Sequence, residues 1–404
     1  MKLDDIFTFR NWAIFLFVLF CIRYIPIETR AGISTLKVAT SGICAFMFLA
    51  YLKPHVNKAL VCCTIYLLYI YMAASFHPES FRVSTILYTA SFLITYCTFY
   101  ELVNFKKVFS LDFFILLVRK LIIIFFVVLL IHQFLRMLGF QELLIVNMQS
   151  LHRGMGSNSL FGEPSTFART MGVLYYAYLK CNEYKQGHAV NIQQIFNRDH
   201  RWVTIGFLWS MFTMGSGTAF ICLGVLSLYF LKGAYFVFAI PIFIAVYFTL
   251  SYFEVKQFER ATSVAEATMT GDVEEIQETD GSASSRIAPL LNTINNLDIN
   301  ESETWFGHGT DYSYKIARSK GIRKIGEIDD YGLIAYFLSL LIVFSCAINF
   351  NSLATVMYFL GIGGGTSNIP YLWGLLMIMT CIRYFNNHYD MEDEEVVEKE
   401  EEED

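Results

Sequence analysis

Residues 112–139 read DFFILLVRKLIIIFFVVLLIHQFLRMLG. This stretch is apolar over a length sufficient to cross a hydrocarbon core of about 30 Å. Backbone groups left unpaired in lipid are costly, so such a stretch predicts a transmembrane helix. Similar runs recur along the chain, in which 55% of the residues are hydrophobic. The sequence therefore predicts an integral membrane protein and excludes a soluble enzyme.

The whole pattern predicts an all-α polytopic membrane protein with about twelve transmembrane helices. Residues 1–253 form an N-terminal transmembrane bundle, and residues 254–330 form a large extracytoplasmic loop with amphipathic helices. Residues 331–389 contain the C-terminal transmembrane helices, and residues 390–404 form a tail. The predicted spans lie near residues 11–26, 32–52, 58–75, 84–103, 112–139, 165–181, 202–214, 217–232, 234–253, 331–349, 352–363 and 370–386.

Basic residues predict the orientation of this bundle. Lysine and arginine fall on alternate connections between the spans, and the side that carries them is expected to be the cytoplasm. Both termini are then cytoplasmic, and the connections at residues 76–83, 140–164 and 254–330 lie outside. The basic residues concerned are Lys2, Arg10, Lys53, Lys58, Lys106, Lys107, Lys180, Lys185, Arg198 and Arg201.

The charges are distributed unevenly. Residues 254–330 carry 15 acidic and 8 basic side chains, and residues 390–404 carry 11 acidic side chains and one lysine. The membrane body is therefore basic, although the formal net charge of the chain is −6. The tail has too few apolar residues to bury a core, so we expect it to be disordered and cytoplasmic. A docking site for a basic partner is the alternative interpretation.

The nine cysteines all lie in or beside apolar segments. Their spacing gives neither a disulfide framework in the large loop nor a zinc site. We expect them to be small buried thiols in helix packing. No metal and no cofactor are expected.

The large polar loop has a readable pattern. Residues 281–286 (GSASSR) precede apolar residues at steps of three and four, which is typical of an amphipathic helix. Residues 305–309 (WFGHG) predict a turn, because their glycines permit positive φ. Transmembrane segments that only anchor or transport are usually joined by short loops, so we interpret this loop as half of an extracytoplasmic active site. The apolar stripe consists of Ile287, Leu290, Leu291, Ile294 and Leu297.

A second polar cluster lies at residues 153–169, on the same predicted side. Pro164 fits the first turn of a helix, so Glu163 is expected at the beginning of that helix. The positive end of the helix dipole would then point to where a lipid phosphate sits. Arg169 lies about one turn farther in, where a charge is by default a functional candidate. A structural pair between Glu163 and Arg169, or snorkelling of Arg169, is the alternative.

Together these motifs resemble those of the Wzy-type O-antigen polymerases, a branch of the O-antigen ligase and polymerase superfamily. The resemblance rests on residues 281–287 (GSASSRI), 305–309 (WFGHG), 162–165 (GEPS) and Gly332 at the start of the next span. It implies a multi-pass enzyme of the bacterial inner membrane that joins oligosaccharide repeat units carried on undecaprenyl diphosphate. Asp329 and Asp330 stand where the ligase branch has a His-Asn pair, which favours a polymerase.

The resemblance also implies roles for individual residues. Outer-loop arginines of the family hold the diphosphate, and Arg286 matches the family arginine best. We expect Arg286, Arg169 and Arg153 to bind the diphosphate, because a guanidinium contacts phosphate oxygens through two N–H groups at once. Glu163 and His308 are the candidate bases. The predicted catalytic residues are thus Arg286, Glu163 and His308.

This interpretation predicts a metal-independent glycosyltransferase that makes O-antigen, capsule or exopolysaccharide. Its partners would be the undecaprenyl-diphosphate-linked oligosaccharide and membrane lipids, with a chain-length regulator as a further candidate. No nucleic-acid partner is expected. Two alternatives stay open, namely an O-antigen ligase-type glycan transferase and a polysaccharide-lipid flippase or transporter.

Overall fold

The part of the chain described by the computed structural model is almost entirely helical. No β-strand occurs within this part, and one isolated bridge joins Leu143 to Met148. The predicted all-α class is therefore confirmed. The described residues are 8–22, 35–143, 148, 157–231, 248, 249, 252, 262, 263, 266, 281–359 and 370–403.

Several helices of the first half begin at residues that satisfy their unpaired amides. The side chain of Asn57 accepts a hydrogen bond from the amide of Leu60 at 2.9 Å. Pro164 occupies the first turn of its helix with Glu163 as the N-cap residue, as predicted. The elements are α2 (Phe9–Cys21), α3 (Thr35–Met47), the π-helix η1 (Phe48–Leu52), α4 (Lys58–Ser75), α5 (Val83–Asn104), α6 (Leu111–Met137), α7 (Pro164–Gln186), α8 (Ile192–Ile195), α9 (Arg201–Thr213) and α10 (Gly217–Ser227).

The second half contains shorter elements around one long interrupted helix. Gly332 has φ 83° and ψ 177°, which breaks the helical path of α16 near its start. The elements are α14 (Gly281–Asn295), α15 (Ser302–Phe306), the π-helix η3 (Ser313–Ala317), α16 (Gly326–Ile342), the π-helix η4 (Val343–Ala347), α17 (Leu353–Met357) and α18 (Pro370–Glu403).

Four helical segments among the described residues are long and apolar enough to cross a membrane. They are α4, α5, α6 and the continuous segment formed by α16 and η4. Shorter apolar helices occur at α2, residues 36–52 and α10. The chain thus has the helices of a membrane protein, whereas the number of twelve spans stays a prediction. Most of the predicted span at residues 234–253 lies outside the described residues.

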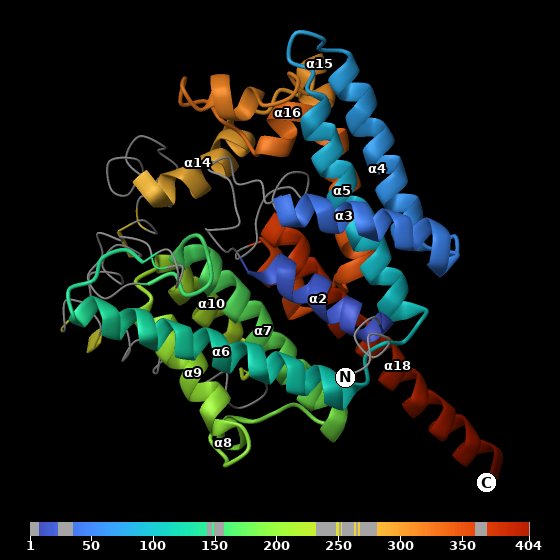
Figure 1. Cartoon of the computed structure of the whole chain (residues 1–404), viewed down its shortest axis with the longest axis vertical. Helices are drawn as coiled ribbons and strands as arrows, with labels where there is room; N and C mark the ends of the chain where they lie inside the picture. Colours follow the sequence, from blue (N-terminus) through green and yellow to red (C-terminus); the bar gives the residue numbers. More distant parts are fainter. Residues whose placement is uncertain are drawn as a thin grey trace.

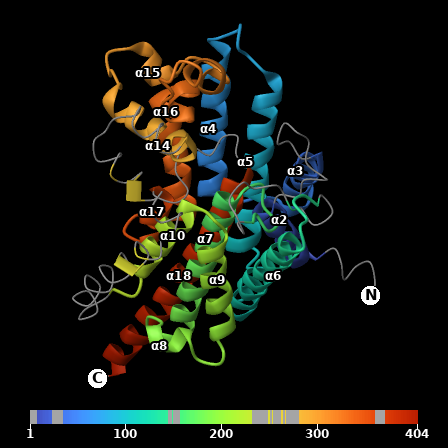
Figure 2. The same cartoon turned by 90° about the vertical axis from the view of Figure 1, so that its left-hand side faces the viewer.

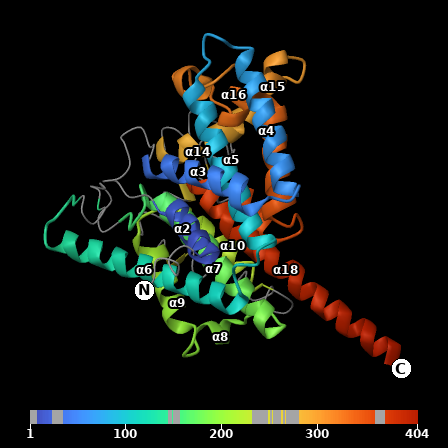
Figure 3. The ribbon, with the colours of Figure 1, turned by 45° about the vertical axis from the view of Figure 1, so that its right-hand side comes forward.

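Helix α7 lies at the centre of one half of the structure. It packs against α6, α9, α10 and α18, and most of its side chains are buried. Helix α18 also packs on α2 and α5, so it links this half to the part that contains α4 and α16. Figures 1, 2 and 3 show α6 running across the direction of α4 and α5. The cysteines are free thiols and all but Cys62 are buried, as expected for packing residues.

The acidic tail differs from our expectation of disorder. Helix α18 continues through it and ends at Glu403. Figures 1 and 3 show this end of α18 extending away from the other helices. Glutamate is a good helix former, and a helix that has already started gains one backbone hydrogen bond for each residue added. These two effects favour the helical conformation, whereas repulsion between neighbouring acidic side chains opposes it.

The amphipathic helix predicted in the large loop is present as α14. Within it, Leu290 and Ile294 are exposed rather than packed against the described core. Leu291 is only partly buried, so much of the apolar side of α14 is left uncovered by the described residues. Most of residues 254–280 lie outside the described part of the chain.

Candidate functional site in the predicted outer loop

The candidate site forms where residues 307–309 meet the start of α16. The amide of His308 donates to the carbonyl oxygen of Asp329 at 2.9 Å, and the amide of Gly309 donates to the carbonyl oxygen of Asp330 at 3.0 Å. These two backbone hydrogen bonds join segments that are distant in sequence. The turn at residues 305–309 and the first residues of the next span thus form one structural unit.

Two glycines make this close approach of the two segments feasible. Gly307 has φ 79° and ψ −176°, and Gly332 has φ 83° and ψ 177°. Glycine is essentially the only residue that adopts this region of φ and ψ. A Cβ atom at Gly307 would overlap the carbonyl of Asp330, and one at Gly332 would overlap the carbonyl of Trp305. The backbone contact therefore requires glycine at both positions.

The carboxylates of Asp329 and Asp330 also stabilise this part of the structure through hydrogen bonds. Both side chains are buried. Asp329 Oδ2 accepts a hydrogen bond from the amide of Lys324 at 2.8 Å, and Asp330 Oδ1 accepts one from the amide of Ser313 at 2.8 Å. A buried carboxylate is costly unless it is hydrogen-bonded, so these amides stabilise both carboxylates. Asp329 thus fixes the residues that directly precede α16, and Asp330 fixes the start of η3.

Side chains of α4 also contact the unit formed by residues 305–309 and the start of α16. The hydroxyl of Tyr66 donates to the buried carboxylate of Glu327. The hydroxyl of Tyr69 lies 3.1 Å from the carbonyl oxygen of Trp305 and 3.0 Å from that of Tyr331. One tyrosine therefore contacts both segments that the two glycines bring together.

The connection after α4 packs against the turn as well. Arg82 forms an ion pair with Asp311 at 2.9 Å, and a Cβ atom at Gly309 would overlap Ser80 and approach His77. The predicted topology puts residues 76–83 and 254–330 on the same side of the membrane. The direct contact between the two connections agrees with that prediction.

His308 is held in a defined orientation at this turn. Its ring stacks on Tyr312, with 4.1 Å between ring centroids and 9° between ring planes. Its Nδ1 lies 3.3 Å from the carbonyl oxygen of Asp329, which can only accept, so Nδ1 carries the proton of this contact. Burial lowers the pKa of His308 below its ordinary value of 6.5. At neutral pH the ring is then uncharged, and Nε2 has a lone pair available to take up a proton.

Helix α14, which carries Arg286, is attached to the candidate site through its C-terminal half. The side-chain amide of Asn292 donates to the carbonyl oxygens of Gly321 and Arg323 at 3.1 and 3.0 Å. The amide of Ile325 donates to Thr293 Oγ1 at 3.0 Å. These contacts attach α14 to the segment that leads into Asp329. Arg286 lies on the same helix, about 9 Å along its axis from Asn292.

The segment attached to α14 is rich in basic residues. Lys315, Arg318 and Lys320 are exposed, and Arg323 and Lys324 are partly buried. The positive side chains follow His308 in sequence and precede the buried aspartates. Lys315 also pairs with Asp311 at 3.7 Å, so the exposed Arg318 and Lys320 are the side chains best placed to attract an anionic group such as a diphosphate.

The predicted cluster at the start of α7 lies elsewhere. Glu163 is exposed, and its Oε1 accepts a hydrogen bond from Ser165 Oγ at 2.6 Å. Arg169 is partly buried on α7, close enough to Cys222 of α10 to act on it electrostatically. In Figures 1 and 2, α14, α15 and α16 lie at the top of the structure, whereas most of α7 lies lower. The described contacts do not bring Glu163 or Arg169 next to His308. Arg153 lies outside the described residues.

The contacts that Tyr66 and Tyr69 of α4 make with the site were not predicted from the sequence. Glu327 was visible as an acidic residue before the span, but nothing in its sequence context indicated Tyr66 as its partner. Tyrosines at positions 66 and 69 of an apolar helix resemble the many other tyrosines of this chain. Their separation by three residues, which places them on one helix face, was the available signal.

A comparison with known protein families, curated proteins and solved structures finds no match to this chain.

Proposed function

We propose that this chain is a polymerase that joins undecaprenyl-diphosphate-linked oligosaccharide repeat units into a surface polysaccharide. The reaction would take place at the outer face of a bacterial inner membrane. The observation that supports the proposal most is the position of His308, an uncharged base candidate fixed beside a basic segment. The resemblance of residues 281–287 and 305–309 to the Wzy-type polymerases supplies the substrate class.

The proposed reaction is a single glycosyl transfer. A hydroxyl group of the acceptor sugar attacks the anomeric carbon of the lipid-linked donor glycan. A glycosidic C–O bond forms, the bond from that carbon to the diphosphate oxygen breaks, and the diphosphate leaves with the electron pair. The hydroxyl proton passes to Nε2 of His308, which is the role of a general base.

Basic side chains would stabilise the departing diphosphate. Its negative charge grows as the bond breaks, so a positive group placed there stabilises the transition state more than the ground state. Arg286 on α14 is the proposed ligand, and the exposed Lys315 and Arg318 would add to the local positive potential. Arg169 and Arg153 stay proposed ligands of the diphosphate, and Glu163 stays the alternative candidate for the general base.

We expect the variant His308→Gln to polymerise at least about 100-fold more slowly than the wild type. Glutamine keeps an N–H group for the carbonyl of Asp329 but cannot take up a proton from the acceptor. The wild-type rate should fall as the pH decreases below the ordinary histidine value of 6.5 and through the lower pKa of buried His308. The measurement is the polymerisation rate of purified protein between about pH 5 and 8.

The matched control for this variant is Tyr312→Phe, which keeps the stacked ring beside His308. It should retain most of the wild-type rate and the same pH profile. Unfolding temperatures of both variants separate loss of chemistry from loss of structure. A wild-type rate for a correctly folded His308→Gln protein would contradict the role of His308 as the base.

A further inference from the structure

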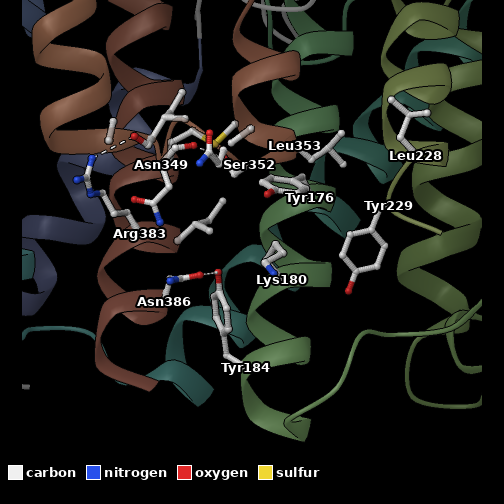
Figure 4. A pocket seen from close by; sticks show the side chains of 16 residues that line it. Tyr176, Lys180, Tyr184, Leu228, Tyr229, Asn349, Ser352, Leu353, Arg383 and Asn386 are labelled. Carbon is white, nitrogen blue, oxygen red and sulfur yellow. Dashed lines mark hydrogen bonds between the residues drawn. The ribbon is translucent and has the colours of Figure 1, made fainter. Parts of the chain in front are cut away.

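A second polar site lies far from His308, at a cavity of about 410 Å³ between α7, α18, α17 and the segment after α10. Figure 4 shows Arg383 and Asn386 on the wall formed by α18, and Tyr176, Lys180 and Tyr184 facing them from α7. Leu228 and Tyr229 form the opposite wall. A cavity of this volume can enclose a small ligand or a lipid headgroup.

One wall of the cavity carries a lysine in a fixed position. Lys180 Nζ donates to Glu183 Oε1 at 2.7 Å, and the hydroxyl of Tyr229 donates to Glu183 Oε2 at 2.6 Å. Lys180 also lies over the ring of Tyr184, with Nζ 4.9 Å from the ring centroid. An ammonium group has three N–H donors, so Lys180 retains donors for a ligand in the cavity.

The facing wall carries an arginine that is also held in place. Nη1 of Arg383 donates to the carbonyl oxygens of Phe344 and Ile348 at 2.5 and 3.1 Å. These carbonyls lie at the end of η4, where a helix leaves acceptors unpaired. A guanidinium has five N–H groups, so those on Nε and Nη2 remain for other acceptors. Lys180 and Arg383 together with Glu183 give this site a net charge of +1.

The remaining lining is divided between polar and apolar groups. Asn349, Asn351 and Ser352 add hydrogen-bonding groups, whereas Leu228, Leu353, Met379 and Ile382 are apolar. The net charge of +1 suits one phosphodiester, which carries a single negative charge. The apolar side chains suit the glycerol and the first methylene groups of a lipid. A free phosphate would leave this apolar part of the cavity without a complementary ligand group.

The position of the cavity along the chain indicates the leaflet that it faces. Lys180 and Lys185 lie near the C-terminal end of α7, the end that the distribution of basic residues predicts to be cytoplasmic. Tyrosine and lysine side chains are favoured at the boundary between lipid and water. Basic pockets between transmembrane helices on this side bind the headgroups of anionic lipids.

We propose that this cavity binds the phosphodiester headgroup of an anionic phospholipid from the cytoplasmic leaflet. Lys180 and Arg383 contact the phosphate from opposite walls, and Leu228 and Ile382 contact the adjoining acyl region. This site goes beyond the polymerase proposal, because it lies on the side opposite to the predicted outer loop and takes part in no glycosyl transfer.

The test is lipid binding by the full-length protein purified in detergent. Native mass spectrometry and thermal unfolding are measured during titration with phosphatidylglycerol, with phosphatidylcholine and with glycerol 3-phosphate. We expect saturable binding of phosphatidylglycerol with an increase in unfolding temperature, and at least about tenfold weaker binding of the other two compounds. The variant Lys180→Gln should weaken phosphatidylglycerol binding by about tenfold or more.

The matched control is Lys185→Gln on the same helix. Lys185 is more than half exposed and pairs with Asp112 outside the cavity, so this variant should bind phosphatidylglycerol like the wild type. If Lys180→Gln does not fold, Ser352→Phe, which fills the cavity, should abolish binding instead. Three results would each overturn the proposal. They are binding of phosphatidylcholine as tight as that of phosphatidylglycerol, binding of glycerol 3-phosphate as tight as that of phosphatidylglycerol, and wild-type binding of phosphatidylglycerol by the folded cavity variants.

Discussion

Cells in which Arg286 is replaced by alanine are expected to display single repeat units instead of long polysaccharide, while the variant protein inserts into the membrane at normal levels. The expected loss of polymerisation rate is at least about 100-fold. The physical reason is that Arg286 is proposed to contact the diphosphate, whose charge increases as it leaves. Gel sizing of the surface glycan, with immunoblotting of the membrane fraction, measures both outcomes.

Two further variants make this experiment specific. Arg286→Lys should restore little activity, because a compact ammonium cannot form the paired N–H contacts of a guanidinium with phosphate oxygens. Arg198→Ala removes an exposed arginine on the predicted cytoplasmic side and should have no effect. Long polysaccharide made by cells with Arg286→Ala at wild-type rates would contradict the arginine contact.

Gly332→Ala is expected to destabilise the candidate site strongly. The conformation of Gly332 costs a residue with a Cβ atom of the order of 1–3 kcal/mol. The added methyl group would in addition overlap the carbonyl of Trp305. We expect the unfolding temperature of the purified protein to fall by about 5 °C or more. Polymerisation should be lost as well, because residues 305–309 can no longer hold His308 in place.

Gly224→Ala is the control for this substitution. Gly224 lies within α10, and a Cβ atom there would meet no heavy atom within 4 Å. Alanine favours a helix more than glycine does, so this variant should be as stable as the wild type or slightly more stable. Identical unfolding temperatures for the two variants would show that the contact between Gly332 and Trp305 is absent in solution.

Local sequence signals predicted much of the helical structure. The apolar runs at residues 58–75, 84–103 and 112–139 coincide closely with α4, α5 and α6, because runs of this length satisfy both burial and backbone hydrogen bonding as helices. Pro164 predicted the start of α7 because a proline is tolerated only in the first turn. The acidic tail was predicted less well, since low apolar content rules out a core but not a helix.

The candidate site was predictable only in part. The glycines at 307, 309 and 332 indicated special backbone conformations, and all three have positive φ. Their mutual contact could not be inferred, because it depends on how residues 305–309 pack against α16. The same limit applies to Tyr66 and Glu327, which are far apart in sequence and meet through tertiary packing. Grouping Glu163 and Arg169 with His308 rested on a shared predicted side of the membrane, and a shared side does not fix a distance.

The proposed polymerase forms glycosidic bonds between lipid-linked repeat units. The most direct measurement is the length of the glycan made by the purified protein in liposomes that contain only undecaprenyl-diphosphate-linked repeat units. We predict products of many repeat units in the presence of EDTA, and none from the Arg286→Ala protein. Substrate that remains as single repeat units would contradict the polymerase. Movement of these units across the bilayer would then favour a flippase, and their transfer only to a separately supplied acceptor would favour a ligase.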